Sequence, residues 1–193
     1  MGSTSNFLDE AHQLSLQAYR AQVARRPEGL DEEEVAEAVS VAAIVFSNLS
    51  RSRLKDVHFK WEHALEFQGD SGPYLLYACA RINGIKEKAA LAGIDPTSSI
   101  DAAFLAEESA YRLASLLVDF ETTLDRVLAE NEPAHLAAYA LDLAKHFSKA
   151  YNNLQVVGAE PAVASARLSL FDAVRIVLTS SLNLLGIRTI DRM

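Results

Sequence analysis

The sequence predicts an all-α fold, a bundle of amphipathic helices. Apolar side chains recur at helical spacing along most of the 193 residues. Glycine (8) and proline (5) are scarce while alanine and leucine dominate, a composition that favours helix over sheet. Half of the residues are hydrophobic and 23% are charged, as in a globular chain and not a disordered one. One large domain or two small ones would fit this length.

The first two helices are bounded by clear sequence features. Apolar residues at helical spacing predict a helix over 7–26, which stops at Pro27. Asp31 is a candidate N-cap with Glu34 three residues later, in the manner of a capping box. Acidic residues also suit the positive end of the helix dipole. The helix that they begin should run to about Leu49.

After the second helix, the polar and basic segment 50–60 is predicted to be an extended linker, and 61–67 to form one or two helical turns. Residues 68–73 have turn chemistry, with glycines that tolerate positive φ and a proline suited to the first position of a helix. The remaining helices are expected at 73–91, 101–118, 120–130, 133–152 and 162–185, with Gly186 as a C′ glycine. The sequence thus predicts two helices, a linker and a bundle of about five helices.

Charge and composition limit the classes of function. The net charge of −8 argues against nucleic-acid binding over the whole surface, but it permits a local basic face such as the one that residues 51–60 and 81–88 would form. The chain has no apolar run near the roughly 20 residues that span a bilayer, and its start does not resemble a secretory signal. A single cysteine, Cys79, suits a reducing compartment, so we expect a cytoplasmic protein without a membrane partner.

Tyr77 and Arg81 are the first candidate site residues. They lie four apart, so they share a face of the helix that follows the glycine-containing turn. The plain interpretation is a core tyrosine beside a surface arginine. The functional interpretation is an aromatic platform with a cation, as used to bind splayed single-stranded bases.

Other chemistry has little support in the sequence. His58 and His63, five apart, lack the spacing that places two metal ligands on one helical face, as do His135 and His146, eleven apart. No phosphate-binding loop or nucleophile elbow occurs, and no pair of carboxylates stands out as a general acid and base. We therefore expect no catalytic residue and no metal site in this chain.

Residues 59–85 carry a family resemblance. They contain a Phe-x-Trp run, the turn Gly-Asp-Ser-Gly-Pro-Tyr-Leu and a Tyr-Ala-x-x-Arg-Ile helix start, and this stretch resembles the segment of arginyl-tRNA synthetases that leads into their anticodon-binding domain. Residues 141–152 are similar to a family helix of the form Leu-x-x-x-Phe-x-x-Ala-Tyr-Asn. The end of the chain resembles the family's Leu-Leu-Gly-Ile run and terminal Arg-Met, with Ile190 and Asp191 where members usually have Pro-Glu.

The resemblance implies the fold, a helical bundle of the class I synthetase anticodon-binding type, and a set of residues that contact tRNA. Tyr77 and Tyr151 would stack on anticodon bases, Arg81 would contact a phosphate or a base edge, and the loop before them would lie against the anticodon loop. The full set of implied tRNA-binding residues is Gln68, Gly69, Asp70, Ser71, Tyr77, Arg81, Tyr151 and Met193.

The resemblance also implies the domain organisation. Residues 1–6 would be a tag or a disordered start, 7–60 two helices and a linker to a catalytic domain, and 61–193 the anticodon-binding bundle. The His-Ile-Gly-His-like and Lys-Met-Ser-Lys-like motifs of the catalytic domain do not occur here. The chain by itself would therefore not be an enzyme or bind a cofactor, because ATP and arginine would bind the missing domain.

The implied partners are arginine tRNA and the catalytic domain of the same synthetase, with no DNA. Two alternatives remain open at this point. One is a free-standing synthetase paralogue that binds RNA or protein without ligase activity, and the other is a helical bundle with no role in RNA binding.

Overall fold

The computed structural model describes residues 4–21, 29–56, 58–97, 100–101, 103 and 106–193. Within these ranges every regular element is a helix and no strand occurs, which confirms the predicted fold class. The helices are α1 (Thr4–Arg20), α2 (Glu32–Leu49), α3 (Trp61–Ala64), α4 (Gly72–Leu91), α5 (Glu108–Glu130), α6 (Ala134–Asn153) and α7 (Pro161–Leu184). None of the described helices is both long and apolar enough to cross a bilayer.

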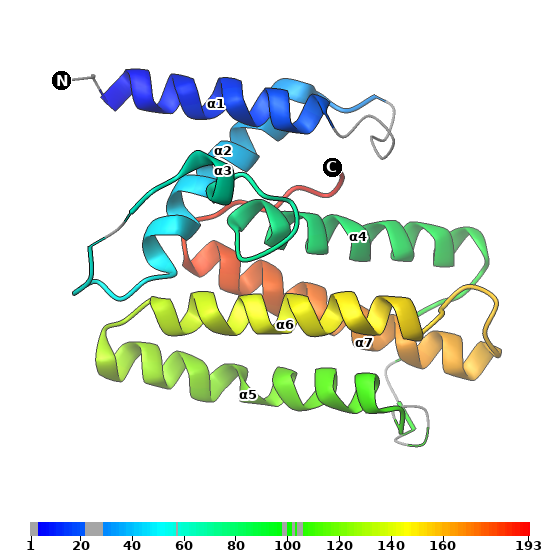
Figure 1. Ribbon diagram of the computed structural model, residues 1–193. Coiled ribbons are helices and arrows are strands. Elements are labelled where there is room, and N and C mark those ends of the chain that lie inside the picture. Colours follow the sequence, from blue (N-terminus) through cyan, green and yellow to red (C-terminus); the bar gives the residue numbers. More distant parts are fainter. Residues whose placement is uncertain (1–3, 22–28, 57, 98–99, 102, 104–105) are drawn as a thin grey trace.

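Helices α4, α5, α6 and α7 form the body of the molecule (Figure 1). Helices α5 and α6 are an antiparallel pair, α7 packs against both of them, and α4 lies along α6 and α7. Helix α1 packs on α2, and α2 in turn contacts α4. The arrangement places the N-terminal pair of helices at one side of a four-helix body.

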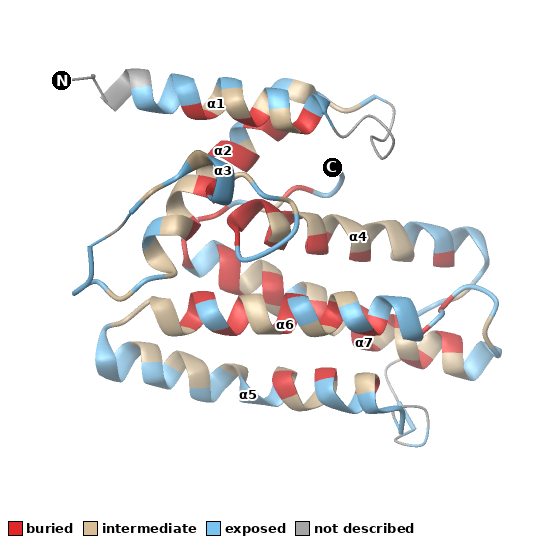
Figure 2. Cartoon of the chain, viewed as in Figure 1, coloured by how far each residue is buried: buried red, intermediate tan, exposed pale blue. Residues whose placement is uncertain are grey.

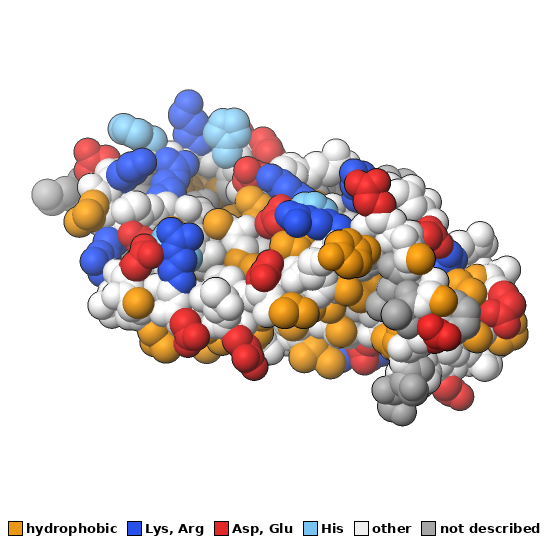
Figure 3. All heavy atoms as spheres, turned by 90° about the horizontal axis from the view of Figure 1, so that it is seen from below, with side chains coloured by type: hydrophobic (Ala, Val, Ile, Leu, Met, Phe, Trp, Pro, Cys, Tyr) orange, Lys and Arg blue, Asp and Glu red, His pale blue; other side chains and the backbone are white. Residues whose placement is uncertain are grey.

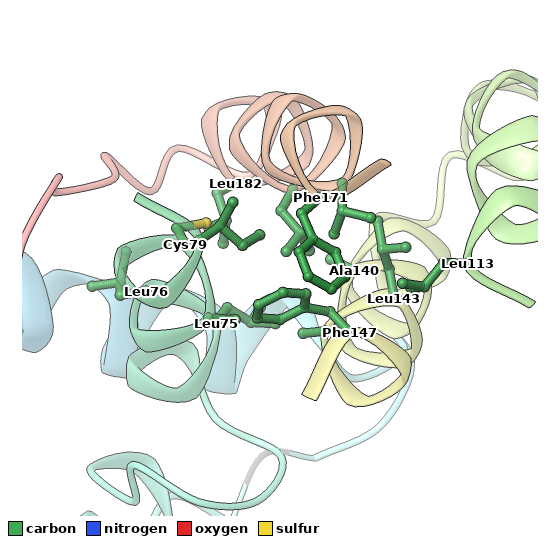
Figure 4. Close-up of a cluster of buried hydrophobic side chains, with 14 of the residues drawn as sticks. Leu75, Leu76, Cys79, Leu113, Ala140, Leu143, Phe147, Phe171 and Leu182 are labelled. Carbon is green, nitrogen blue, oxygen red and sulfur yellow. The ribbon is translucent and has the colours of Figure 1, made fainter. Parts of the chain in front are cut away.

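The core lies between the four long helices, and each helix turns its buried face inward (Figure 2). Phe147 of α6 and Phe171 of α7 meet edge to face at 5.3 Å between ring centroids. Figure 4 shows these rings beside Leu75 and Cys79 of α4 and Leu113 of α5. Close packing of apolar side chains from four helices holds the bundle together.

The predicted helix ends are confirmed at several positions. The Asp31 carboxylate accepts hydrogen bonds from the backbone N–H groups of Glu33 (3.0 Å) and Glu34 (3.4 Å). Gly186 has φ +79° just after α7, as a C′ glycine should, and the N–H of Ile187 donates to the Leu182 carbonyl at 2.8 Å.

The prediction of two helices over 101–118 and 120–130 is wrong. The structure has a single helix, α5, which begins only at Glu108 and continues to Glu130. No glycine or proline interrupts that range, so nothing stops the helix near residue 119. Residues 102, 104 and 105 lie outside the described ranges.

The N-terminal helix differs in its bounds. It ends at Arg20 and not near residue 26, and 22–28 are outside the described residues. It begins at Thr4, within the segment 1–6 that was expected to be a tag or a disordered start, and residues 1–3 lie outside the described part. Its Phe7 stacks on Trp61 at 4.9 Å between ring centroids, so the first helix is joined to the short helix α3.

Candidate nucleic-acid interface

Helices α4 and α6 run side by side in the same direction, and their line of contact, which we term the α4–α6 seam, organises the candidate site (Figure 1). Three side-chain contacts follow one another along both helices. They are Asp70 Oδ1 to Lys145 Nζ at 2.5 Å, Tyr74 Oη to Ser148 Oγ at 3.0 Å, and the Arg81 guanidinium over the Tyr151 ring at 3.8 Å. The seam thus joins the loop before α4 to the last turn of α6.

Arg81 lies between two tyrosines at the far end of the seam. Its guanidinium carbon is 3.8 Å from the centroid of the Tyr151 ring and 5.5 Å from that of Tyr77. Both distances fall within the range of cation–π attraction. In the described part of the chain no carboxylate lies within 4.0 Å of Arg81, so its charge remains available to an anionic partner.

The sequence explains how these three side chains meet. Tyr77 and Arg81 share a face of α4 because they are four residues apart. Tyr151 stands in the last turn of α6 and is 36% exposed, while the buried Phe147 supports it edge to face, with 6.0 Å between the ring centroids. One face of the Tyr151 ring is therefore covered by Arg81, while the side chain as a whole stays partly exposed.

The three residues open onto a hollow of about 410 Å³, which we term the Arg81 hollow. Helix α4 supplies most of its lining, and Tyr151 and the end of the chain complete it. The lining residues are Tyr77, Ala80, Arg81, Gly84, Ile85, Glu87, Lys88, Tyr151, Arg192 and Met193. Four of the residues implied by the resemblance, Tyr77, Arg81, Tyr151 and Met193, thus come together in one place.

The segment after α7 is tied to α4 and forms one wall of the hollow. The Asn83 amide donates to the backbone and side-chain oxygens of Asp191 at 3.1 and 3.2 Å. Arg192 Nε donates to Glu87 at 2.8 Å, and Ile190 is buried. Ile190 and Asp191, the departure from the family pattern, therefore hold the segment in place beside Met193.

The loop before α4 lies at the other end of the seam. Gly69 has φ +118°, a backbone conformation that residues other than glycine rarely adopt. Gln68, Gly69 and Asp70 are exposed. Ser71 is only 1% exposed. Its hydroxyl donates to the Glu66 carbonyl and accepts from the N–H of Tyr74, so its side chain shapes the loop and caps α4. Only Gln68, Gly69 and Asp70 of the implied loop residues face solvent.

Ser52 and Arg53 of the basic segment 50–60 lie away from the Arg81 hollow. Arg53 donates to the backbone carbonyl of Asn131 at 2.7 Å, and Ser52 donates to Glu132 at 2.9 Å. Both contacts are at the turn before α6, about 25 Å along that helix from Tyr151 at 1.5 Å per residue. On the face seen in Figure 3, Lys, Arg and His side chains gather toward the left end with acidic side chains among them, and the rest of the face mixes both signs.

Sequence reasoning missed Gly84, Lys88 and Arg192 as lining residues. The helical repeat contains the information for two of them, because Gly84 and Lys88 follow Arg81 by three and seven residues and so lie on the same face. Arg192 is the neighbour of Met193, but only the folded chain shows that it borders the hollow.

Other chemistry remains without support in the described residues. Burial raises the pKa of the Cys79 thiol to about 12, so this cysteine is a protonated packing residue. Across the described ranges no three His, Cys, Asp or Glu side chains are grouped so that they could hold a metal ion.

The fold agrees with the comparisons with known proteins. A family model of the DALR anticodon binding domain matches residues 75–193, and the chain belongs to this family. The matched range begins within α4 and includes Tyr77, Arg81, Tyr151 and Met193, while the loop at 68–71 precedes it.

Proteins with similar sequences include arginine–tRNA ligases. The chain is 35% identical over 171 residues to the arginine–tRNA ligase of Clostridioides difficile, which covers 89% of this chain and 30% of that protein. It is 36% identical over 163 residues to the cytoplasmic arginine–tRNA ligase of Saccharomyces cerevisiae, with 83% of this chain and 26% of the relative covered. The chain therefore spans about a third or less of the length of these relatives.

A solved structure gives the same result. The arginyl-tRNA synthetase of Thermus thermophilus matches the whole chain with a TM-score of 0.89 and 32% identity, over 32% of that protein. The predicted resemblance is confirmed: the chain corresponds to the anticodon-binding region of arginyl-tRNA synthetase homologues.

Proposed function

We propose that the α4–α6 seam and the Arg81 hollow bind the anticodon loop of arginine tRNA. In this proposal the module positions the tRNA for aminoacylation by a catalytic domain, which binds ATP and arginine. The observation that carries the proposal is the stacked group of Tyr77, Arg81 and Tyr151 at the edge of the hollow. Aromatic rings and guanidinium planes are the surfaces on which unpaired RNA bases stack.

The loop at 68–70 extends this surface along the seam. Its exposed backbone and the Asp70–Lys145 pair place polar groups at the opposite end of the seam from the aromatic group, where the phosphates of a bound loop would run. Met193 offers an apolar contact from the segment that walls the hollow. We also propose a cytoplasmic location, which the name of the yeast relative and the single reduced cysteine support.

Titration of the protein with arginine tRNA and with a tRNA of different anticodon, each at two salt concentrations, tests the proposal. We expect tighter binding of arginine tRNA at both concentrations. Equal affinity for both tRNAs with a steep salt dependence would indicate non-specific binding and contradict the proposal. An absence of binding would favour a bundle without an RNA role.

Arg81→Ala and Tyr151→Ala should each weaken the binding of arginine tRNA by about 1–3 kcal/mol, because each removes one partner of the stacked group. The measurement is a filter-binding titration at fixed salt. Matched controls are Tyr111→Ala and Arg126→Ala on α5, since neither residue lines the Arg81 hollow and both are well exposed. If the α5 variants lose as much affinity as the two site variants, the binding surface lies elsewhere.

A further inference from the structure

Gly84 has no structural reason to be a glycine. It lies in the middle of α4, where glycine is among the least favourable residues. A Cβ added at Gly84 would meet no atom within 4 Å outside its own helix neighbourhood. Gly72 is the contrast, since a Cβ there would lie 2.1 Å from the carbonyl oxygen of Ala42. Packing requires the glycine at 72 and does not require the one at 84.

The position of Gly84 connects it with the Arg81 hollow. Arg81 precedes it by three residues and Lys88 follows it by four, so all three lie on one face of α4, and all three line the hollow. Both neighbours carry long side chains. Gly84 therefore leaves the helix backbone uncovered between two cations and next to the stacked Arg81–Tyr151 pair.

We propose that Gly84 determines what fits in the hollow, by letting a flat nucleobase lie directly against the backbone of α4. This inference rests on the proposed function and deepens it. The base would stand beside the Arg81 guanidinium, and its phosphate would face Lys88. A side chain at position 84 fills the space that the ring needs, whereas it leaves the cations and both tyrosines in place.

Two substitutions test the inference. Gly84→Ala adds one methyl group into open space, so its melting temperature should rise and its affinity for arginine tRNA should fall only a few-fold. Gly84→Leu keeps good helix propensity and adds branched bulk. Its affinity should fall by roughly tenfold or more. The matched control is Ala90→Leu, which is exposed on the same helix and does not line the hollow. It should bind as the unmodified protein does.

A tRNA series identifies the base. Arginine tRNAs that carry an abasic nucleotide at one anticodon-loop position at a time are titrated against the unmodified protein and against Gly84→Leu. We expect one position at which removal of the base makes the two proteins bind equally, because the ring that collides with Leu is gone. A general loss of stability in Gly84→Leu would weaken the binding of every tRNA in the series, so it would not make the two affinities equal at one position only.

The outcomes separate this inference from the proposed function. If Gly84→Leu binds as tightly as the unmodified protein while Arg81→Ala is weakened, the inference about Gly84 is overturned and the proposed function stands. The inference also fails if the Gly84→Leu defect persists with every abasic tRNA. If neither Arg81→Ala nor Gly84→Leu changes the affinity, both fail together.

Discussion

At the residue scale, Arg81 combines two properties that favour the binding of single-stranded RNA, a flat surface and a positive charge. Its guanidinium is planar and stacks over the Tyr151 ring, and its charge has no carboxylate partner in the described part of the chain. A lysine at this position would keep the positive charge but would have no planar group to stack on a ring. The site therefore offers a flat surface and an attraction for phosphate in one side chain.

Lys145 is held differently, because Asp70 neutralises it at 2.5 Å. The Asp70→Asn variant leaves Lys145 without its carboxylate, so the lysine can pair with a phosphate of the bound loop. We expect a few-fold tighter binding of arginine tRNA and a slope of log affinity against log salt that is steeper by about 0.7. Filter-binding titrations across a salt series measure both quantities.

The control for Asp70→Asn is Asp125→Asn, an exposed carboxylate on α5 whose removal changes the net charge by the same amount. Equal slopes for the two variants would mean that net charge and not Lys145 is responsible. Asp70 and Lys145 are each about half exposed or more, so the loss of their ion pair in Asp70→Asn should change the stability little.

At the scale of the elements, the start of α4 is fixed by a close approach to α2. The Gly72 Cα faces the backbone of Ala42, and the Ser71 hydroxyl caps the first turn. The same turn presents the exposed loop at 68–70 to solvent. The Gly-Asp-Ser-Gly-Pro sequence thus has two parts, one that packs and one that is available to a partner.

Gly72→Ala should destabilise the protein by about 3 kcal/mol, because the methyl group would have to displace the α2 backbone. Gly84→Ala, in the same helix, should instead stabilise it by about 0.5–1 kcal/mol. Urea unfolding followed by circular dichroism measures both free energies of unfolding. Equal effects of the two substitutions would show that helix propensity alone is at work and that α2 does not approach α4 closely.

At the scale of the whole molecule, side chains far apart in the sequence connect the helices. His12 of α1 pairs with Glu33 of α2 at 2.7 Å, and Lys86 of α4 with Asp172 of α7 at 2.5 Å. The hydrogen bond that His12 donates to the Glu33 carboxylate raises the pKa of His12, against the opposing effect of partial burial. Burial would raise the pKa of Asp172, but the hydrogen bonds from Lys86 and Arg175 outweigh it and lower that pKa.

These two shifts predict how stability depends on pH. The raised pKa of His12 contributes stability that is fully present below its ordinary value of 6.5 and is lost as the pH rises through the raised value. The lowered pKa of Asp172 contributes stability that is present above its ordinary value of 3.8 and is lost as the pH falls through the lowered value. Both contributions are therefore complete between these two values.

Urea unfolding at a series of pH values checks this prediction. Relative to the unmodified protein, His12→Gln should lose stability mainly at the acidic end of the range from pH 5 to 8, and Asp172→Asn mainly above pH 4. If the difference in free energy of unfolding between His12→Gln and the unmodified protein does not shrink as the pH rises, the raised pKa of His12 is contradicted.

Local spacing was sufficient for much of the fold and for part of the site. Asp31, Gly186 and the glycine–proline turn mark helix ends through bonds within a few residues, so their roles follow from the sequence. The absence of glycine and proline from 108–130 is consistent with the uninterrupted α5, although two helices were predicted over this part of the chain. The shared face of Tyr77 and Arg81 is equally local.

By itself, then, the sequence determined the all-α class, most helix bounds and the residues that the family resemblance implies for the site. Only the tertiary structure decided that Arg81 covers Tyr151, that Ser71 is buried, that the segment after α7 walls the hollow and that Gly84 lies open within it. Helix formation depends on neighbours within one or two turns, whereas these contacts depend on which apolar faces pack together across the whole chain.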